Sequence, residues 1–137
     1  MRTRVATARV ARLATVRPDG TPHIVPVCFA LLTGATGDVL VSAVDDKPKT
    51  TSALQRLKNV VANPPVAFLV DHYEEEWGRV WWVRGDGDAH VLDDGAEHDR
   101  AATALREKYE QYHEQELAGP ILAIDVRRWV GWAYDGS

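Results

Sequence analysis

The segment Ser42–Thr51, SAVDDKPKTT, has the composition of an anion-binding site. It brings a serine, two lysines and two adjacent threonines to the start of a predicted helix. Lys47 and Lys49 would supply positive charge, and Thr50 would donate a hydrogen bond beside the free backbone amides of the helix. Two aspartates in the same segment offset part of this charge, so the alternative is a solvated turn that caps the helix. We therefore take Lys47, Lys49 and Thr50 as candidate ligands of an anionic group.

Tryptophan makes the second group of candidate binding residues, because all five lie in the later half of the chain: Trp77, Trp81, Trp82, Trp129 and Trp132. Trp81 and Trp82 are adjacent on a predicted strand, so their side chains must face opposite sides of the sheet. One of the two can fill the interior, while the other needs cover from a helix, a partner subunit or a planar ligand. For Trp129 and Trp132 we favour packing in the core or in a dimer interface.

Several other chemistries have no signature in the sequence. The five histidines have no metal-ligand spacing, and the chain lacks GxSxG, GxxxxGK[ST] and GxGxxG motifs. We expect no metal site and assign no catalytic residue. His72 and His98 are interpreted as surface or strand-end residues rather than acid catalysts, and Cys28 as a small buried hydrophobic residue.

The first half of the chain predicts a short helix at residues 2–10, followed by two strands within residues 11–32. Pro18-Asp19-Gly20 forms the turn between them, because proline fixes φ and glycine tolerates positive φ. A further strand is expected at residues 38–44. Apolar residues at helical spacing then predict a helix that starts near Thr50 and ends at Asn63-Pro64-Pro65.

The second half predicts strands at residues 66–73 and 80–92, the latter bent at Gly85 and Gly87. A surface helix is expected from Gly95 to Leu117, and a last strand from Ile121 to Tyr134. The sum is a mainly β chain with six strands and two or three helices. Short strands linked by turns, with glycines at bends, favour a small antiparallel barrel that occupies residues 1–137 as a single domain.

Composition and charge limit the function further. The 137 residues are 45% hydrophobic and 26% charged, as in an ordinary globular protein. Residues 1–60 hold nine Lys/Arg and four Asp/Glu, whereas residues 61–137 hold seven and sixteen, which gives the net charge of −4. This balance argues against nucleic-acid binding but leaves the first half able to bind an anionic ligand. No apolar run suits a signal peptide or a membrane span, and one cysteine cannot form an internal disulfide, so we expect a cytoplasmic protein.

Three segments together resemble the pyridoxamine-phosphate-oxidase-like split-barrel superfamily. They are ARLATVRPDGTPHIVPVCF, VLVSAVDDKPKTTSALQRLKNVVANPPVAFLVD and WGRVWWVRGDGDAHV. Within that superfamily, the chain looks most similar to small actinobacterial flavin and deazaflavin oxidoreductases that depend on coenzyme F420. The resemblance covers residues 9–134. It implies a six-stranded antiparallel split barrel of the FMN-binding type, which forms a homodimer with cofactor sites at the subunit interface.

The resemblance also implies which residues bind the cofactor. Lys47 and Lys49, with Thr50, match the positions that bind the cofactor phosphate. Residues beside the ring system would be Ser42, Ala43 and Val44 at the end of the third expected strand, and Pro26, Val27 and Cys28 on the second. Trp77, Trp82 and Arg84 match segments that reach the cofactor, in some relatives from the other subunit.

The function implied is hydride transfer from reduced coenzyme F420 to a small, conjugated or planar organic substrate. FMN in the same groove is the alternative cofactor, and a non-catalytic carrier of F420, flavin or haem is the alternative function. Arg56 and Lys58, together with Arg2, Arg4 and Arg9, are candidate contacts for the acidic tail of F420. Oxidation of pyridoxamine phosphate is not expected, because the C-terminal arginine motif of those oxidases is missing.

Overall fold

Seven antiparallel strands form one sheet in the computed structural model, which describes residues 2–35, 37–44 and 51–135. In chain order the strands are β1 (Ala11–Val16), β2 (Pro22–Val27), β3 (Ala30–Gly34), β4 (Gly37–Ala43), β5 (Pro65–His72), β6 (Trp81–Leu92) and β7 (Ile121–Ala133). Their order in the sheet is β2-β1-β5-β6-β7-β4-β3, and every adjacent pair is antiparallel. The expected mainly β antiparallel fold is confirmed.

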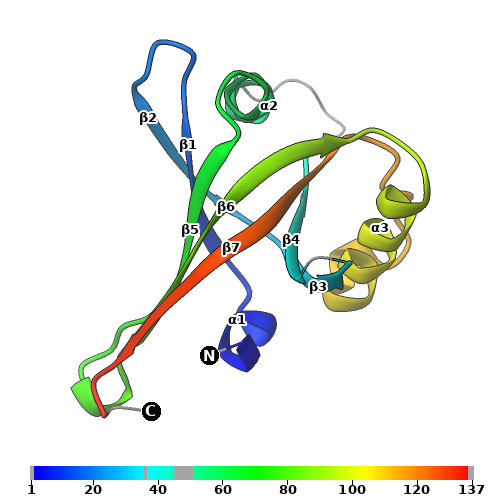
Figure 1. The fold of residues 1–137 in the computed structure, drawn as a ribbon. Helices are drawn as coiled ribbons and strands as arrows, with labels where there is room; N and C mark the ends of the chain where they lie inside the picture. Colours follow the sequence, from blue (N-terminus) through cyan, green and yellow to red (C-terminus); the bar gives the residue numbers. More distant parts are fainter. Residues whose placement is uncertain (1, 36, 45–50, 136–137) are drawn as a thin grey trace.

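The two edges of this sheet are held near each other by the chain itself. β2 and β3 lie at opposite ends of the strand order, yet only Cys28 and Phe29 separate them in sequence. The sheet must therefore curl into an open barrel, which Figure 1 shows. Its interior is filled by buried side chains from several strands, among them Leu13, Phe29, Leu40, Phe68, Val70, Leu122 and Ile124.

The expected count of six strands was one too few, because residues 22–32 do not form a single strand. At Cys28 and Phe29 the chain leaves its pairing with β1 and begins to pair with β4. The polar groups of this corner bind side chains instead of a neighbouring strand. Ser42 Oγ donates to the Cys28 carbonyl at 2.7 Å, and the Phe29 N–H donates to Tyr109 Oη at 3.0 Å.

The glycines of β6 are required by close packing. A Cβ at Gly85 would lie 2.1 Å from the Phe68 ring, and one at Gly87 would lie 2.3 Å from the Asp125 carbonyl oxygen. The register with β7 also shifts between Asp86 and Gly87, which is the expected bulge. The bend predicted in this strand is therefore confirmed.

Three α-helices pack around the barrel within the described ranges: α1 (Arg2–Thr7), α2 (Thr51–Ala62) and α3 (Ala96–Lys108). The turns η1 (Trp77–Arg79) and η2 (Glu110–Tyr112) are single 3₁₀ turns. The prediction of α2 was right, but the other two helices are shorter than expected. α3 ends at Lys108 rather than at residue 117, because Tyr109 is extended, with φ −112° and ψ 119°. This conformation places its buried phenol at the Phe29 corner.

Polar side chains fix α2 over one end of the barrel. Asn59 is fully buried and donates to Thr15 Oγ1 on β1 at 2.8 Å, while Gln55 Nε2 donates to Asn59 Oδ1 at 2.8 Å. Asn63, just beyond the helix, donates to the Arg17 carbonyl oxygen at 3.0 Å. These bonds satisfy buried polar groups and set where α2 lies on the sheet.

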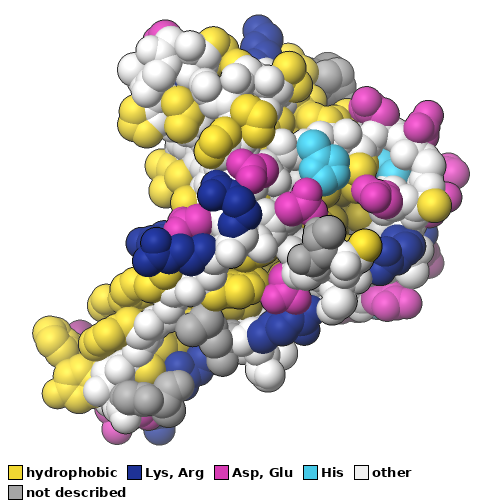
Figure 2. All heavy atoms as spheres, in the orientation of Figure 1, with side chains coloured by type: hydrophobic (Ala, Val, Ile, Leu, Met, Phe, Trp, Pro, Cys, Tyr) yellow, Lys and Arg dark blue, Asp and Glu magenta, His cyan; other side chains and the backbone are white. Residues whose placement is uncertain are grey.

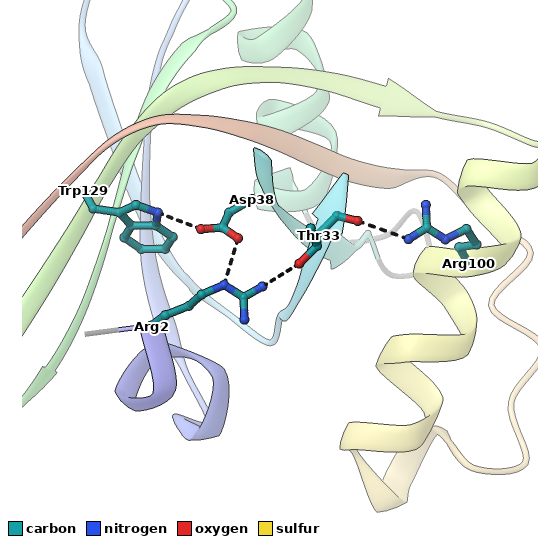
Figure 3. A network of polar contacts seen from close by, with 5 residues as sticks. All are labelled: Arg2, Thr33, Asp38, Arg100 and Trp129. Carbon is teal, nitrogen blue, oxygen red and sulfur yellow. Dashed lines mark hydrogen bonds and ion pairs between the residues drawn. The ribbon is translucent and has the colours of Figure 1, made fainter. Parts of the chain in front are cut away.

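A second polar network joins α1 to the strands (Figure 3). Asp38, at the start of β4, accepts hydrogen bonds from Trp129 Nε1 at 3.0 Å and from Arg2 Nε at 2.8 Å. Arg2 also donates to Thr33 Oγ1 at 3.1 Å, and Arg100 of α3 donates to the Thr33 carbonyl oxygen at 3.4 Å. Three elements distant in sequence, α1, α3 and β7, are thereby tied to the β3–β4 hairpin.

β5, β6 and β7 continue past the barrel as a long ribbon, which we call the arm (Figure 1). At its end, Trp77 and Tyr134 make an edge-to-face contact with ring centroids 6.4 Å apart, and both are largely exposed, at 69% and 57%. Figure 2 shows apolar side chains along much of this arm. Among the described residues, no helix combines the length and apolar character that a bilayer crossing requires.

Candidate functional site

A cavity of about 510 Å³ lies where β2 and β4 end, and we call it the β2–β4 cavity. Its lining includes Pro26, Val27 and Cys28 from the end of β2 and the residue after it, and Ser42, Ala43 and Val44 from the end of β4. Arg56 of α2 and four residues after α3 complete it: Tyr112, Gln115, Leu117 and Gly119. The volume is within the range of small-molecule and cofactor sites.

The β2–β3 corner shapes one wall of this cavity. The hydrogen bond from Ser42 Oγ to the Cys28 carbonyl holds the ends of β2 and β4 together. Ser42 is buried, and its hydroxyl proton is donated to the Cys28 carbonyl. Its oxygen can still accept a hydrogen bond. Val27 and Val44, both nearly fully buried, add apolar side chains to this wall, against which a planar ring could pack.

A further part of the lining comes from residues 112–119, of which those up to Leu117 were predicted to be helical. Because α3 ends early, this segment instead runs through η2 and a loop into β7. Gln115 donates from its side chain to the Gln111 carbonyl at 3.0 Å, which fixes the turn. The Val44 N–H donates to the Pro120 carbonyl oxygen at 3.0 Å, which joins this loop to the end of β4.

Arg56 supplies the positive charge of the cavity. Its Nε is buried and has no hydrogen-bond partner in the described chain, although the side chain reaches the cavity lining. Burial lowers the pKa of the guanidinium, and Tyr112 opposes that effect. An arginine stays protonated in a protein, so a buried Nε–H group without an acceptor is unfavourable. An anionic ligand in the cavity would remove this penalty.

His23 on β2 also has a buried ring nitrogen, and the positive charge of Arg56 acts on its imidazole. Its Nδ1 has no hydrogen-bond partner among the described residues. The pKa of His23 is lowered first by burial and then by the charges of Arg17 and Arg56. The ring is therefore held neutral, and it can offer either a donor or an acceptor according to its tautomer.

The structure brings together six of the twelve residues that the resemblance assigns to the cofactor. Residues 26–28 and 42–44 all line the β2–β4 cavity, although they are distant in sequence. Lys47, Lys49 and Thr50 lie outside the described residues, just before the start of α2.

The three remaining candidates lie on the arm and do not line this cavity. Trp77 belongs to η1, and Arg84 on β6 forms an ion pair with Asp86 at 3.1 Å. Trp82 is opposite Trp132 on β7. Trp81 faces the barrel core with the Arg4 guanidinium 5.3 Å above its ring, so the two adjacent tryptophans do face opposite sides as predicted. Trp129 packs edge-to-face on Phe68, which confirms its expected place in the core.

Two of the arginines before the first strand, which were proposed to contact the acidic tail of F420, make contacts within the protein instead. Arg2 is bound to Asp38, and Arg9 donates to the Lys108 carbonyl at 3.1 Å while stacking on the Tyr109 ring. Arg56, in contrast, does reach the cavity. The sequence pattern placed Tyr112, Gln115 and Leu117 in a helix that continues to Leu117, which hid their role in the cavity, and it did not single out Gly119, which follows that helix.

One histidine was interpreted wrongly. His98 is only 5% exposed, with Nε2 2.8 Å from the Gly119 carbonyl oxygen, and so it is a buried structural residue of α3 rather than a surface one. His72 does lie at an exposed strand end, where it pairs with Glu74. Across residues 2–35, 37–44 and 51–135, no three His, Cys, Asp or Glu side chains are arranged to hold a metal ion.

Comparison with known proteins agrees with this architecture. The protein-family model described as pyridoxamine 5′-phosphate oxidase matches residues 1–133 of this chain. A search of curated proteins gave no match. Among solved structures, a conserved hypothetical protein from Mycobacterium tuberculosis has a TM-score of 0.75 at 21% identity, over 96% of this chain and 81% of that one.

Two other similar structures have ligands in their names. An FAD-binding protein from Mesorhizobium loti has a TM-score of 0.68 at 24% identity, over 95% of this chain and 87% of that one. A haem storage protein from Vibrio cholerae has a TM-score of 0.66 at 16% identity, over 96% and 89%. At these identities, the similarity establishes that the three solved structures share the fold of this chain.

Proposed function

Because the chain belongs to the pyridoxamine 5′-phosphate oxidase family, we propose that it is an oxidoreductase that binds a phosphate-bearing deazaflavin or flavin in the β2–β4 cavity. The leading cofactor is reduced coenzyme F420, used to reduce a small, conjugated or planar organic substrate. One observation carries this proposal: Arg56, whose buried Nε has no hydrogen-bond partner among the described residues, lines the same cavity as residues 26–28 and 42–44.

The residues of the cavity fit an anionic ligand with a planar ring. Arg56 would pair with the anionic part, and Val27, Val44 and Leu117 would contact the ring and exclude water from it. When bound, reduced F420 or FMN supplies the hydride. The protein then needs to align donor and acceptor, which agrees with the lack of an assigned catalytic side chain. We assign no proton donor.

The second anion contact in this proposal is Lys47, Lys49 and Thr50. Its support is position in the chain, because these residues follow β4, whose end lines the cavity, and precede α2, which carries Arg56. Lysines contributed by this part of the chain, together with Arg56, would suit a phosphate. Lys58, exposed on α2, stays a candidate for the acidic tail of F420.

A homodimer is part of the same proposal. Trp77 and Tyr134 expose large aromatic surfaces at the end of the arm, away from the barrel of their own chain. Surfaces of this kind usually mark an interaction site. A second copy would cover them and could bring Trp77, Trp82 and Arg84 to the cavity of its partner. We expect this dimer to work in the cytoplasm, in keeping with a single free cysteine.

FMN is the alternative cofactor, because its single phosphate requires fewer cationic contacts than the phosphate and acidic tail of F420. The FAD-binding protein of similar fold supports a flavin as a candidate. The haem storage protein of similar fold supports testing haem, in which case this chain would be a carrier.

Optical spectroscopy distinguishes these cofactors directly. The purified protein is titrated with F420, FMN and haem, and binding is followed by absorbance and fluorescence. Tight, saturable binding of F420, followed by oxidation of F420H2 in the presence of quinones, enones or tetrapyrroles, is the expected result. FMN binding with turnover would replace F420 by the alternative cofactor. Haem binding without any turnover would make the protein a carrier and overturn the proposed activity.

Arg56→Gln tests the observation that carries the proposal. The substitution should weaken cofactor binding by about 10-fold to 100-fold, which is the usual size of a lost charge-assisted contact. Without cofactor, the variant should be as stable as the parent protein, because no protein hydrogen bond to Nε is lost. Arg128→Gln, at an exposed arginine outside the cavity lining, is the matched control. Equal cofactor affinity in all three proteins would place the anion elsewhere.

A further inference from the structure

A second cavity, of about 420 Å³, lies between α3 and the outer face of the sheet, and we call it the α3 groove. It shares no lining residue with the β2–β4 cavity. Its floor is apolar and comes from Leu32, Val39, Val41, Leu92 and Ala123 on four strands. An apolar floor of this size with a few polar groups at the rim is the usual composition of a small-molecule site.

The rim of the groove carries charges of both signs. Glu97 and Arg100 are three residues apart on α3 and thus lie on the same side of the helix. Asp125 faces them from β7, and His90 from β6 lies between the carboxylates. Figure 2 shows acidic side chains gathered on the α3 side of the molecule.

Much of the hydrogen-bonding capacity of this rim is unused. His90 Nδ1 is 3.6 Å from Asp125 and Nε2 is 3.9 Å from Glu97, and both distances are too long for hydrogen bonds. The two carboxylates are 51% and 73% exposed, so a bound molecule can reach them. Arg100 makes one long hydrogen bond, to the Thr33 carbonyl at 3.4 Å, which leaves further N–H groups of the guanidinium able to donate.

We propose that the α3 groove binds a small zwitterion with an apolar body, such as a free amino acid with an aliphatic or aromatic side chain. The ammonium group would donate to the exposed oxygens of Glu97 and Asp125 beside the His90 ring, and the carboxylate would accept from Arg100. The side chain would cover Leu32, Val39 and Leu92. A simple cation would be repelled by Arg100 and a simple anion by the two carboxylates, so a ligand with both charges fits the rim best.

The first experiment compares L-leucine and L-phenylalanine with derivatives that lack one charge. Binding to the full-length protein is measured by calorimetry and by chemical shifts of the backbone amides. The free amino acids should bind saturably, with shifts at residues of β3, β7 and α3. N-acetyl-L-leucine and L-leucinamide should each bind about 10-fold more weakly or worse. No saturable binding of either amino acid, or equal affinity for the derivatives, would overturn the proposal.

Substitutions then test the rim. Glu97→Gln and Arg100→Gln should each weaken leucine binding by about 10-fold or more, and Asp125→Asn should do the same without touching α3. Arg106→Gln and Glu107→Gln are matched controls, because they remove the same charges from the same helix outside the groove. If the controls weaken binding as much as the rim variants, the groove is not the site. Because binding is measured without cofactor, this result is independent of the proposed oxidoreductase activity.

Discussion

The phenol oxygen of Tyr109 lies 3.0 Å from the backbone nitrogen of Phe29 and accepts its hydrogen bond, and it donates in turn to the Arg9 carbonyl at 2.8 Å. This one side chain therefore satisfies two backbone groups that the sheet leaves unpaired. The corner between β2 and β3, and with it one wall of the β2–β4 cavity, depends on a residue 80 positions away in the chain.

We predict that Tyr109→Phe lowers the free energy of unfolding by about 1–3 kcal/mol, because it leaves the buried Phe29 N–H and the Arg9 carbonyl without partners. Urea denaturation measures this loss. Tyr73→Phe, which removes a hydroxyl from a residue that is 68% exposed, should be nearly neutral. Equal stability of the parent and Tyr109→Phe proteins would show that water replaces the phenol at this corner.

Gly85→Ala should be strongly destabilising, because its Cβ would lie 2.1 Å from the Phe68 ring. Relief of such a contact requires the ring or β6 to move, which usually costs about 1–3 kcal/mol. Thermal and chemical denaturation provide the measurement. Gly78→Ala is the control, since a Cβ there meets nothing within 4 Å. A loss of stability in the control as large as at Gly85 would refute the steric explanation.

The titration of Lys108 should make the free energy of unfolding depend on pH above neutrality. Its Nζ is buried, has no hydrogen-bond partner in the part of the chain that the structure describes, and lies 3.7 Å from the centre of the Phe29 ring. Burial first, and then the charge of Arg9, lower its pKa from 10.5 to about 8. Between pH 8 and 10.5 the unfolded chain therefore binds more protons than the folded one, so the contribution of Lys108 to stability rises with pH across this window.

Lys108→Met removes this titration, so the stability of the variant relative to the parent protein should be greatest below pH 8 and should decrease as the pH approaches 10.5. Urea denaturation at a series of pH values measures the difference. The exposed Lys58→Met variant should show no such trend. A constant difference between Lys108→Met and the parent protein across this range would contradict the lowered pKa.

Lys49→Ala tests the anion contact expected before α2. The substitution should weaken cofactor binding by about 1–3 kcal/mol, the usual scale for a charge-assisted hydrogen bond. Fluorescence titration gives the affinity, and Arg128→Ala, at an exposed arginine outside the cavity lining, controls for the general loss of one positive charge. Unchanged affinity in Lys49→Ala would assign the anion to Arg56 alone.

The arm predicts a dimer with a mass near twice 15.2 kDa. Light scattering after gel filtration measures that mass. Trp77→Ser combined with Tyr134→Ser should shift the protein toward monomer, because both aromatic surfaces are then lost from the end of the arm. Val61→Ser, at a residue 75% exposed on α2, should leave the mass unchanged. A parent protein that is monomeric and still binds cofactor would rule out an interfacial site.

Local patterns accounted for much of the fold. The Pro18-Asp19-Gly20 turn, helix α2 with its proline terminator and the bent strand β6 were all predicted correctly, because each depends on neighbours in sequence. The errors were made where a distant residue decides the backbone. Strand 22–32 divides at Cys28 and Phe29 because Ser42 and Tyr109 satisfy that corner. The helix that was predicted to continue to residue 117 ends at Lys108, because the backbone of Tyr109 must be extended for its phenol to reach the corner at Phe29.

The sequence by itself determined the mainly β character, most element positions and the family resemblance, since periodicity, turn residues and motifs are local properties of a chain. Tertiary structure alone decided that residues 26–28, 42–44 and Arg56 line one cavity, and that His98 is buried. It also brought Glu97, Arg100 and Asp125 around a second cavity. These groupings depend on strand order and on where helices pack, and long-range contacts of that kind leave no regular spacing in the sequence.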